Sequence, residues 1–347
     1  MIFRQLFDSA SCTYTYIIAS RAGREALIID PVLEKVDRYI QLLSELDLSL
    51  VKAADTHLHA DHITGLGALR DRTQCITMMG EQSNVDVVSV RLKDDDVIEI
   101  EGLEIKAIYT PGHTQDSYSF LMDDRVFTGD TLFIRGTGRT DFQQGDALAQ
   151  YDSLFNRLLR LADDTLVYPG HDYKGDTVST IGEEKRFNPR LQVNSVEEYV
   201  EIMNNLNLQN PKMMDVAVPA NMHIGMSQDE VDNRGWSIDV SDAGGRVDRT
   251  DVLLADLRDH REREQHGVIA GSVHTPYSEL RQNLRPGGML YELITSTHKN
   301  LLFYCAYGER SAMAVKVAQE AGIESARHVK GGMDAWKKAG LPVQTVT

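Results

Sequence analysis

The densest group of metal-ligating residue types lies in one heptapeptide, Thr56–His62, which reads THLHADH and follows an apolar, strand-like run. In an extended chain, side chains two residues apart point the same way, so His57 and His59 can face one point. Asp61 and His62 follow directly. Imidazole and carboxylate groups without a thiolate suit zinc, iron or manganese, and they argue against a structural zinc site built on cysteines.

Three further residues of ligand type each follow a predicted strand and a turn-forming glycine. They are His113 in YTPGHT, Asp130 in FTGDTLF and His171 in YPGHDY. Loops at strand ends are where a rigid scaffold holds polar groups around a cavity, so we expect these residues to converge on the heptapeptide. The alternative is that these are ordinary core or capping histidines. That would explain a single histidine, but not three ligand-type residues that each follow a predicted strand and a glycine.

A second candidate site centres on one cysteine. Residues Leu301–Ser311 read LLFYCAYGERS, an apolar strand that leads into the loop CAYGER and then into a predicted helix, Ser311–Glu320. Backbone N–H groups of such a turn can converge on one point, and a helix N-terminus adds positive potential. We therefore predict that Cys305 is a nucleophile with a lowered pKa rather than a buried structural cysteine. The predicted cradle for its persulfide comprises Ala306, Tyr307, Gly308, Glu309 and Arg310.

The candidate metal ligands lie in a block from Met1 to about Gly225, in which predicted strands alternate with predicted helices. These elements must position the ligands. Helices are expected over Leu148–Leu161 and Val196–Leu206, the second with a capping box that begins at Ser195. The strands predicted from short β-branched or apolar runs are Tyr14–Ala19, Ala26–Asp30, Val51–Asp55, Ile105–Thr110, Arg125–Thr128 and Thr165–Tyr168.

A polar stretch separates this block from the one that carries the cysteine. Residues 226–250 are rich in Asp, Arg, Gly and Ser and contain no long apolar run, so we interpret them as a linker. A new block begins at Asp251, with predicted strands Val252–Leu257 and Leu301–Tyr304.

The length, composition and charge of the chain limit the number of domains, the class of protein and the kinds of partner that we expect. A chain of 347 residues is about right for two domains, and 42% hydrophobic with 25% charged residues suits a globular core. No apolar run reaches the ~18 residues of a membrane span, and the N-terminus shows no secretion or transit signal. A net charge of −16 disfavours a nucleic-acid or anionic-membrane binder. Three widely spaced cysteines suit a reducing cytoplasm, with Cys12 and Cys75 taken as structural.

The pattern HxHxDH with later His, Asp and His resembles the signature of the metallo-β-lactamase fold, an αββα sandwich of two sheets between outer helices. That fold serves di-metal hydrolases and mononuclear iron oxygenases, and all seven potential ligands are present, so the ligand inventory does not choose between them. The flanking segments GDTLFIRGTGRTDFQQG, PGHDYKGDTVSTIGEEKRFNPRL and VPANM resemble the persulfide dioxygenase family, with similarity over most of residues 1–225.

This resemblance implies one Fe(II) per chain, held by His57, His113 and Asp130. Two histidines and one carboxylate leave positions open for the substrate sulfur and O2. The resemblance assigns the orientation of these ligands to His59, Asp61, His62 and His171. It also implies a surface that binds glutathione, the co-substrate. The candidate contacts are Arg190, Tyr173, Lys174 and Arg139. For each of the basic residues the alternative is a solvated surface charge or a structural ion pair.

The second block resembles the rhodanese (sulfurtransferase) domain, an α/β domain with a parallel sheet. LLADLRDHRE and HVKGGMDAWKKAGLPV carry this resemblance over about residues 251–343, and Cys305 falls at the nucleophile. Two features depart from the pattern: GVIAGS stands where many members have GHIPGA, and Glu309 would weaken attraction for the dianion thiosulfate. Asp256 and Arg258 are expected to be structural partners.

We therefore predict a fused sulfur-metabolism enzyme with a dioxygenase domain (1–225), a linker (226–250) and a rhodanese domain (251–347). The first would oxidise glutathione persulfide with O2 to sulfite and glutathione. The second would transfer sulfane sulfur between thiosulfate and glutathione through a Cys305 persulfide. The alternative is a glyoxalase-II-like dizinc thioester hydrolase with an appended rhodanese or sulfur-sensing domain. The expected partners are these small molecules in the cytoplasm, with no nucleic acid and no membrane, and homo-oligomerisation is left open.

Overall fold

The computed structural model divides into two compact units, each described here by itself. It describes residues 1–86, 88–142, 144–206, 208–209, 213–225, 228–246 and 251–346. The N-terminal unit comprises Met1–Arg70, Thr77–Val85 and Arg91–Met222, and the C-terminal unit comprises Asp71–Ile76, Asp86–Val90 and His223–Thr347. Residues 226–227 and 247–250 of the predicted linker, and the final residue of the predicted rhodanese domain, lie outside the described residues.

The first sheet of the N-terminal unit has six strands that lie in chain order. β1 to β3 are antiparallel neighbours, and β4 joins β3 in parallel. The strands are β1 (Ile2–Asp8), β2 (Thr13–Ala19), β3 (Glu25–Ile29), β4 (Ser49–Ala54), β5 (Ile76–Gly80) and β6 (Val90–Leu92). β2 is buried along its whole length, because it lies inside the sheet and is covered on both faces.

The second sheet has the order β14-β13-β10-β9-β8-β7, and within it β10 and β13 are parallel neighbours. Its strands are β7 (Val97–Ile100), β8 (Leu103–Tyr109), β9 (Tyr118–Leu121), β10 (Arg125–Gly129), β13 (Leu166–Pro169) and β14 (Ser179–Thr180). A short hairpin of β11 (Leu132–Phe133) and β12 (Gly136–Thr137) follows β10.

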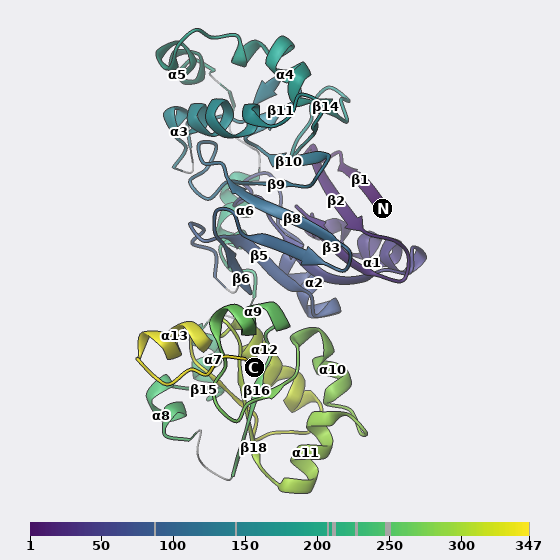
Figure 1. Ribbon diagram of the computed structural model, residues 1–347, viewed down its shortest axis with the longest axis vertical. Helices are drawn as coiled ribbons and strands as arrows, with labels where there is room; N and C mark the ends of the chain where they lie inside the picture. The colour runs from purple at the N-terminus through teal and green to yellow at the C-terminus, as the bar shows by residue number, and fades with distance from the viewer. Residues whose placement is uncertain are drawn as a thin grey trace. The chain divides into compact units, whose positions relative to one another are not determined.

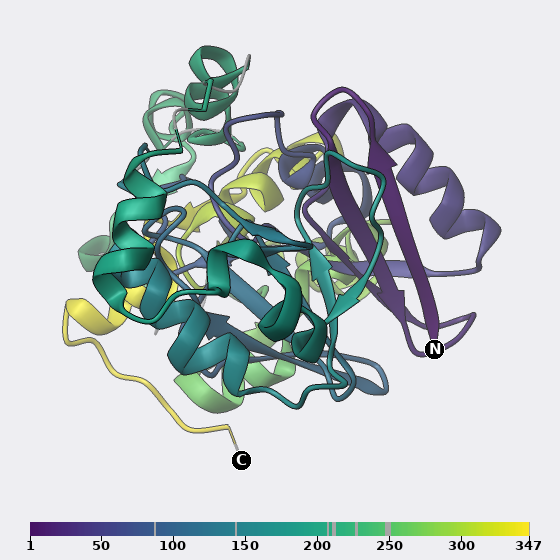
Figure 2. The ribbon, with the colours of Figure 1, turned by 90° about the horizontal axis from the view of Figure 1, so that it is seen from above.

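The two sheets pack face to face through an aromatic cluster. Phe3 and Tyr16 of the first sheet meet Phe127 and Tyr168 of the second, and the Tyr16 and Phe127 ring centroids are 4.8 Å apart. The Tyr16 hydroxyl also donates to the carbonyl of Pro169 at 2.6 Å. Helices cover the outer face of each sheet (Figures 1 and 2). This arrangement confirms the predicted αββα sandwich.

The helices of the N-terminal unit are short, and several carry N-caps. Ser195 caps α5 by accepting from the Glu198 N–H at 3.2 Å, but the Glu198 carboxylate accepts from the Asn194 N–H instead of closing the predicted capping box. The helical segments are η1 (Leu33–Lys35), α1 (Val36–Glu45), α2 (Leu66–Thr73), α3 (Ala147–Asp152), η2 (Ser153–Arg157), η3 (Leu158–Arg160), α4 (Ile181–Phe187), η4 (Pro189–Leu191), α5 (Val196–Asn204) and α6 (Met214–Asn221).

The C-terminal unit is built on a parallel five-stranded sheet with the order β15-β19-β18-β16-β17. Along β18, Leu301 and Phe303 enter one apolar core, whereas Leu302 and Tyr304 enter another. Successive side chains of a strand point to opposite faces, so both faces of this sheet are covered. The strands are β15 (Ser237–Ile238), β16 (Val252–Asp256), β17 (Val273–His274), β18 (Asn300–Tyr304) and β19 (Arg327–Val329).

The helices that flank this sheet begin before Asp251. They are α7 (Gln228–Asn233), α8 (Val240–Gly244), α9 (His260–His266), η5 (Tyr277–Glu279), α10 (Leu280–Asn283), α11 (Met289–Thr297), α12 (Glu309–Glu320) and α13 (Gly332–Lys338). Part of the predicted linker is therefore regular structure, and β15 pairs with β19 inside the sheet. The exact domain boundaries stay predictions. Over the described ranges, no helix is both long enough and apolar enough to cross a membrane.

Candidate metal centre and cysteine loop

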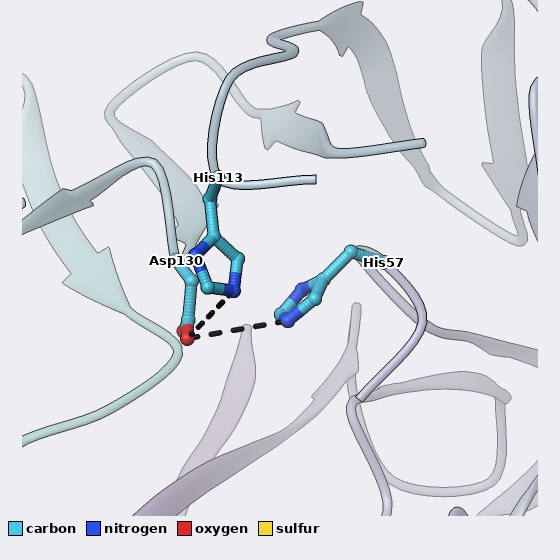
Figure 3. Close-up of side chains that lie close together, drawn as sticks. All are labelled: His57, His113 and Asp130. Atoms are coloured by element: carbon cyan, nitrogen blue, oxygen red, sulfur yellow. Dashed lines mark ion pairs between the residues drawn. The ribbon is translucent and has the colours of Figure 1, made fainter. Parts of the chain in front are cut away.

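Three buried side chains converge from three strand ends of the N-terminal unit (Figure 3). His57 follows β4, His113 follows β8, and Asp130 follows β10. The Asp130 Oδ2 atom lies 3.5 Å from His113 Nε2 and 4.0 Å from His57 Nε2. All three ligand atoms are within 4.8 Å of one another, so one metal ion can contact all of them.

The Nδ1 atom of His57, which points away from Asp130, is held by a chain of hydrogen bonds that starts at Asp30. The Thr56 hydroxyl donates to Asp30 Oδ2 at 2.9 Å, so its oxygen accepts from His57 Nδ1, also at 2.9 Å. This arrangement puts the imidazole hydrogen on Nδ1 and leaves the Nε2 lone pair facing Asp130. Burial lowers the pKa of His57 well below its usual value, which keeps the ring neutral.

The far nitrogen of His113 is fixed in the same sense by the backbone. His113 Nδ1 donates to the carbonyl of Arg139 at 2.7 Å, so Nε2 again carries the lone pair. The chain passes very close to both ligands here, because a Cβ atom added at Gly138 would lie 2.0 Å from the Asp130 carbonyl and 2.9 Å from His113 Nδ1. Glycine at this position lets the hairpin close over the triad.

His171 holds Asp130 from the other side. His171 Nδ1 lies 2.6 Å from Asp130 Oδ1, and His171 Nε2 lies 2.9 Å from Asp61 Oδ2. Burial alone would lower the pKa of His171, but the two carboxylates outweigh burial and raise it well above its usual value. Both nitrogens therefore donate to carboxylates, and the ring bridges Asp61 and Asp130.

The remaining residues of the heptapeptide form a second group around Asp61. The Asp61 Oδ2 atom also contacts His62 Nδ1 at 2.8 Å and the Thr13 hydroxyl at 2.8 Å. His59 Nε2 lies 3.2 Å from Asp30 Oδ1, the same carboxylate that orders the Thr56–His57 pair. His59 Nδ1 and His62 Nε2 are buried without a hydrogen-bond partner in the described structure, and His59, Asp61 and His62 form a second group that could hold a metal ion.

A cavity of about 590 Å³ opens onto the triad. Its lining includes the apolar side chains of Phe133, Ile134 and Phe142 as well as His57, His113 and Asp130. A cavity of this size and lining suits a small organic ligand with a few polar groups. All four residues predicted to contact glutathione, Arg190, Tyr173, Lys174 and Arg139, line it.

The basic residues of the cavity differ in what already binds them. Arg139 pairs with Asp141 and donates to two backbone carbonyls, so its charge is engaged within the wall. Arg190 donates to the Thr137 carbonyl and hydroxyl, and no carboxylate pairs with it among the described residues. Burial lowers the pKa of Arg190. Lys174 and Tyr173 are exposed at the cavity.

Two features of this site escape sequence reasoning. Cys12, treated as structural from the sequence, lies on the wall of the cavity, where the loop after β1 comes close to Tyr173. Asp30 and Thr56 fix the tautomer of His57, but an isolated Asp at a strand end gives no sequence signal. Only the direct succession of Thr56 and His57 could have suggested such a contact.

In the C-terminal unit, the cysteine loop joins β18 to α12, as predicted. Cys305 is fully buried, and its sulfur accepts from the Gly308 N–H at 3.1 Å. The helix begins at Glu309, two residues before the predicted start, because Gly308 adopts a φ of +105° as its N-cap. Asp256 and Arg258 form the expected structural pair, with Arg258 Nη2 2.7 Å from Asp256 Oδ2 and both side chains buried.

The predicted lowering of the Cys305 pKa is wrong. Burial, followed by the charge of Glu309, raises the pKa of the thiol to about 11. The sequence pattern indicates the loop amides and the helix N-terminus correctly, but it does not reveal how completely the sulfur is removed from water. Removing the thiolate from water raises its free energy by more than the N–H donors of the loop can lower it.

Comparison with known proteins agrees with the fold of the N-terminal unit and with that of the C-terminal unit. The profile of the metallo-beta-lactamase superfamily matches residues 76–171, and that of the rhodanese-like domain matches residues 239–339. Human "Persulfide dioxygenase ETHE1, mitochondrial" is 46% identical over 229 residues, which cover 65% of this chain and 89% of the human protein. The chain belongs to the persulfide dioxygenase family.

Solved structures include a persulfide dioxygenase relative that matches a similar share of the chain. The crystal structure of ETHE1 from Myxococcus xanthus is 56% identical, with a TM-score of 0.63, and covers 64% of this chain and 98% of its own. A metallo-beta-lactamase from Staphylococcus aureus has a TM-score of 0.60 over 95% of this chain and 98% of its own. At 22% identity this second likeness supports the fold alone. The rhodanese-like domain is thus an addition to the part shared with the persulfide dioxygenase relatives.

Proposed function

We propose that the N-terminal unit is an Fe(II)-dependent dioxygenase that converts glutathione persulfide, O2 and water into sulfite and glutathione. The observation that carries this proposal is the set of three inward-facing ligand atoms on His57, His113 and Asp130, in a chain 46% identical to a persulfide dioxygenase. The donor set fits iron, because two neutral imidazoles and one carboxylate form the facial triad typical of non-haem Fe(II) oxygenases.

An Fe(II) ion bound there supplies redox chemistry toward O2 and open positions beside the substrate sulfur. The chain's own residues prepare the site for it. Thr56 and the Arg139 carbonyl hold the two imidazoles as Nε2 lone-pair donors, and His171 holds the second oxygen of Asp130. With its outer atoms held, each ligand keeps its inward orientation before the ion arrives, as in other sites with fixed outer contacts.

The contacts of His171 support the ordering of Asp130 around a metal ion. His171 Nδ1 lies 2.6 Å from Asp130 Oδ1, and His171 Nε2 lies 2.9 Å from Asp61 Oδ2. The same Asp61 oxygen also contacts His62 and Thr13. His59, Asp61 and His62 also form a group whose ligand atoms lie within 4.8 Å of one another, so metal quantitation decides between one iron ion and the dizinc hydrolase alternative.

The cavity supports a glutathione-sized substrate. Arg190, which has no carboxylate partner among the described residues, is the strongest candidate to bind a glutathione carboxylate. Tyr173 and Lys174 at the exposed side of the cavity are the further candidate contacts, and the engaged guanidinium of Arg139 makes it a positioning residue for His113 through its carbonyl. The persulfide sulfur would then lie toward the triad.

The test is anaerobic purification, iron and zinc quantitation, and oxygen-electrode measurement with glutathione persulfide. We expect about one iron per chain and persulfide-dependent O2 uptake. His113→Ala and Asp130→Ala should lose iron and uptake together, whereas His223→Ala, at an exposed histidine, should keep both. Two zinc ions without O2 uptake would instead support the thioester hydrolase.

We propose for the second unit that Cys305 carries sulfane sulfur as a persulfide, between a donor such as thiosulfate and glutathione. The rhodanese-like match over residues 239–339 and the position of the sulfur in the loop before α12 support this role. Cys305→Ala should abolish sulfur transfer, and Cys12→Ala should not. Unchanged transfer by Cys305→Ala would leave the unit as a binding or sensing module.

A further inference from the structure

A carboxylate lies directly against the sulfur of the cysteine loop. The Glu309 Oε2 atom is 3.6 Å from Cys305 Sγ, and both side chains are buried, with Glu309 only 8% exposed. On the other side the sulfur accepts from the Gly308 N–H at 3.1 Å, and the Ser311 hydroxyl lies 3.7 Å away. The sulfur therefore faces polar groups of Gly308 and Ser311 on one side and one buried anion on the other.

The basic residue of the loop, Arg310, offsets this anion only in part. Arg310 is fully buried and forms a two-pronged pair with Glu262 of α9, with N–O distances of 2.8 and 2.6 Å. Its Nε atom also lies 3.2 Å from Glu309 Oε1. One guanidinium thus faces two carboxylates, so these three side chains carry a net charge of about −1 beside the sulfur.

The same contacts aim Glu309. Because Arg310 holds Oε1 and is itself fixed by Glu262, the other oxygen, Oε2, is directed at Cys305. A base oriented by a third group toward a nucleophile is the usual arrangement around an activated side chain. Glu309 therefore lies where it can accept a hydrogen bond or a proton from sulfur.

Charged groups on the neighbouring elements are largely neutralised. His328 of β19 reaches the Ser311 hydroxyl with Nδ1 at 3.1 Å, and burial lowers its pKa to about 4, so the ring is neutral. Lys330, also after β19, pairs with Asp232, and on α13 Lys338 pairs with Asp334. The electrostatic environment of the sulfur is therefore set mainly by Glu309.

We propose that Glu309 makes this loop selective for sulfur donors and acceptors that carry an S–H group, such as hydropersulfides and thiols, over the dianion thiosulfate. Thiosulfate carries two negative charges and no hydrogen, so the carboxylate repels it and receives nothing from it. A hydropersulfide has a sulfur-bound hydrogen to donate and at most one charge on its sulfur. This inference rests on the proposed sulfur transfer through Cys305.

The transfer balances without any oxidant or reductant. As Cys305 Sγ attacks the outer sulfur of R–S–S–H, its proton passes to Glu309 Oε2. The new bond joins Sγ to the outer sulfur, and the bond between the two donor sulfurs breaks. The departing thiolate takes the proton from Glu309, so that the products are Cys305–S–SH and R–SH. The return of sulfur to a thiol acceptor follows the same steps in reverse.

The experiment measures the rate at which the full-length protein gains one sulfur atom on Cys305, by mass spectrometry under anaerobic conditions. Glutathione persulfide and thiosulfate are compared as donors for the wild type, Glu309→Gln, and Glu320→Gln, an exposed control on the same helix. We expect the wild type to load at least tenfold faster from the persulfide. Glu309→Gln should raise the thiosulfate rate about tenfold and lower the persulfide rate.

Two further measurements separate selectivity from damage to the fold. Glu309→Asp keeps the charge, so its thiosulfate rate should stay low even where the S–H contact is weakened. The pH profile of Cys305 alkylation by iodoacetamide should move to lower pH in Glu309→Gln, because the thiol loses a neighbouring anion. A merely structural role of Glu309 would leave this profile and the donor ratio unchanged.

Equal loading of the wild type from both donors, or equal donor ratios in Glu309→Gln and Glu320→Gln, would overturn this inference and leave sulfur transfer by Cys305 intact. If Cys305 accepts sulfur from neither donor, the proposed sulfur transfer fails and takes this inference with it.

Discussion

At the scale of single residues, the atom of each ligand that faces away from the triad decides its role. His57 and His113 each have Nδ1 engaged and Nε2 directed at Asp130, whereas both nitrogens of His171 contact carboxylates. The sequence predicts that these residues gather, because each follows a predicted strand that leads into a loop. The residue types alone do not separate His171 from the ligands, and only the family resemblance assigns it an orienting role. The structure gives the physical basis, which is the contact of His171 with Asp61 and Asp130.

Arg190 should bind the substrate without taking part in the reaction. Arg190→Met should raise the KM for glutathione persulfide about ten- to a hundredfold, because a charge-assisted hydrogen bond contributes roughly 1.5–3 kcal/mol. The kcat should change little, since the triad contacts are untouched. Oxygen uptake against persulfide concentration measures both constants. Arg186→Met, at an exposed arginine of α4, is the control, and an unaltered KM in Arg190→Met would reject the contact.

At the scale of elements, the hairpin β11–β12 forms part of the cavity wall, and a buried carboxylate holds it there. Glu184 of α4 is fully buried and bonds to the backbone and guanidinium of Arg135, to Ser179 and to Asn188. Arg135 itself has a φ of +56°, so the turn needs support from outside the hairpin. The α4 helix therefore acts as the anchor of this part of the cavity.

Loss of the Glu184 charge should destabilise the N-terminal unit. Glu184→Gln removes a buried charge that satisfies several donors, at a cost of about 2 kcal/mol, which corresponds to a fall of about 4–8 °C in the midpoint of its thermal transition. Glu183 pairs with the same Arg135, but its side chain is 45% exposed. Glu183→Gln should therefore lower the thermal midpoint much less than Glu184→Gln. Scanning calorimetry measures both, and equal shifts would contradict the anchoring role.

How well an element is predicted depends on how strong its local pattern is. β2, β3, β8 and β10 lie within about two residues of their predicted ranges, because their alternating or fully buried runs are set by the chain itself. The predicted helix Leu148–Leu161 is helical but changes from α through π to 3₁₀ winding, which packing against the second sheet decides. The two-residue strand β15 gave no sequence signal, since pairing with β19 alone defines it.

At the scale of the whole molecule, each site is carried by its own sheets and its own core. The triad and its cavity lie within the N-terminal unit, whereas the cysteine loop lies on a parallel sheet with separate apolar clusters on its two faces. If both proposed activities are present, their tethering in one chain would raise the local concentration of a shared persulfide. The two chemistries nevertheless need no common residue.

The two activities should therefore be separable by point substitutions. Asp130→Ala should abolish persulfide-dependent O2 uptake and leave the anaerobic loading of Cys305 within about twofold of wild type, because substitutions at sites that share no residue or partner behave additively. Cys305→Ala should do the reverse, with full iron content and normal O2 uptake. Oxygen-electrode traces and mass spectrometry on the same preparations measure both. Loss of both activities in either variant would contradict this prediction, provided that the thermal transitions are unaltered. It would mean that each site depends on the other, although each has its own apolar core.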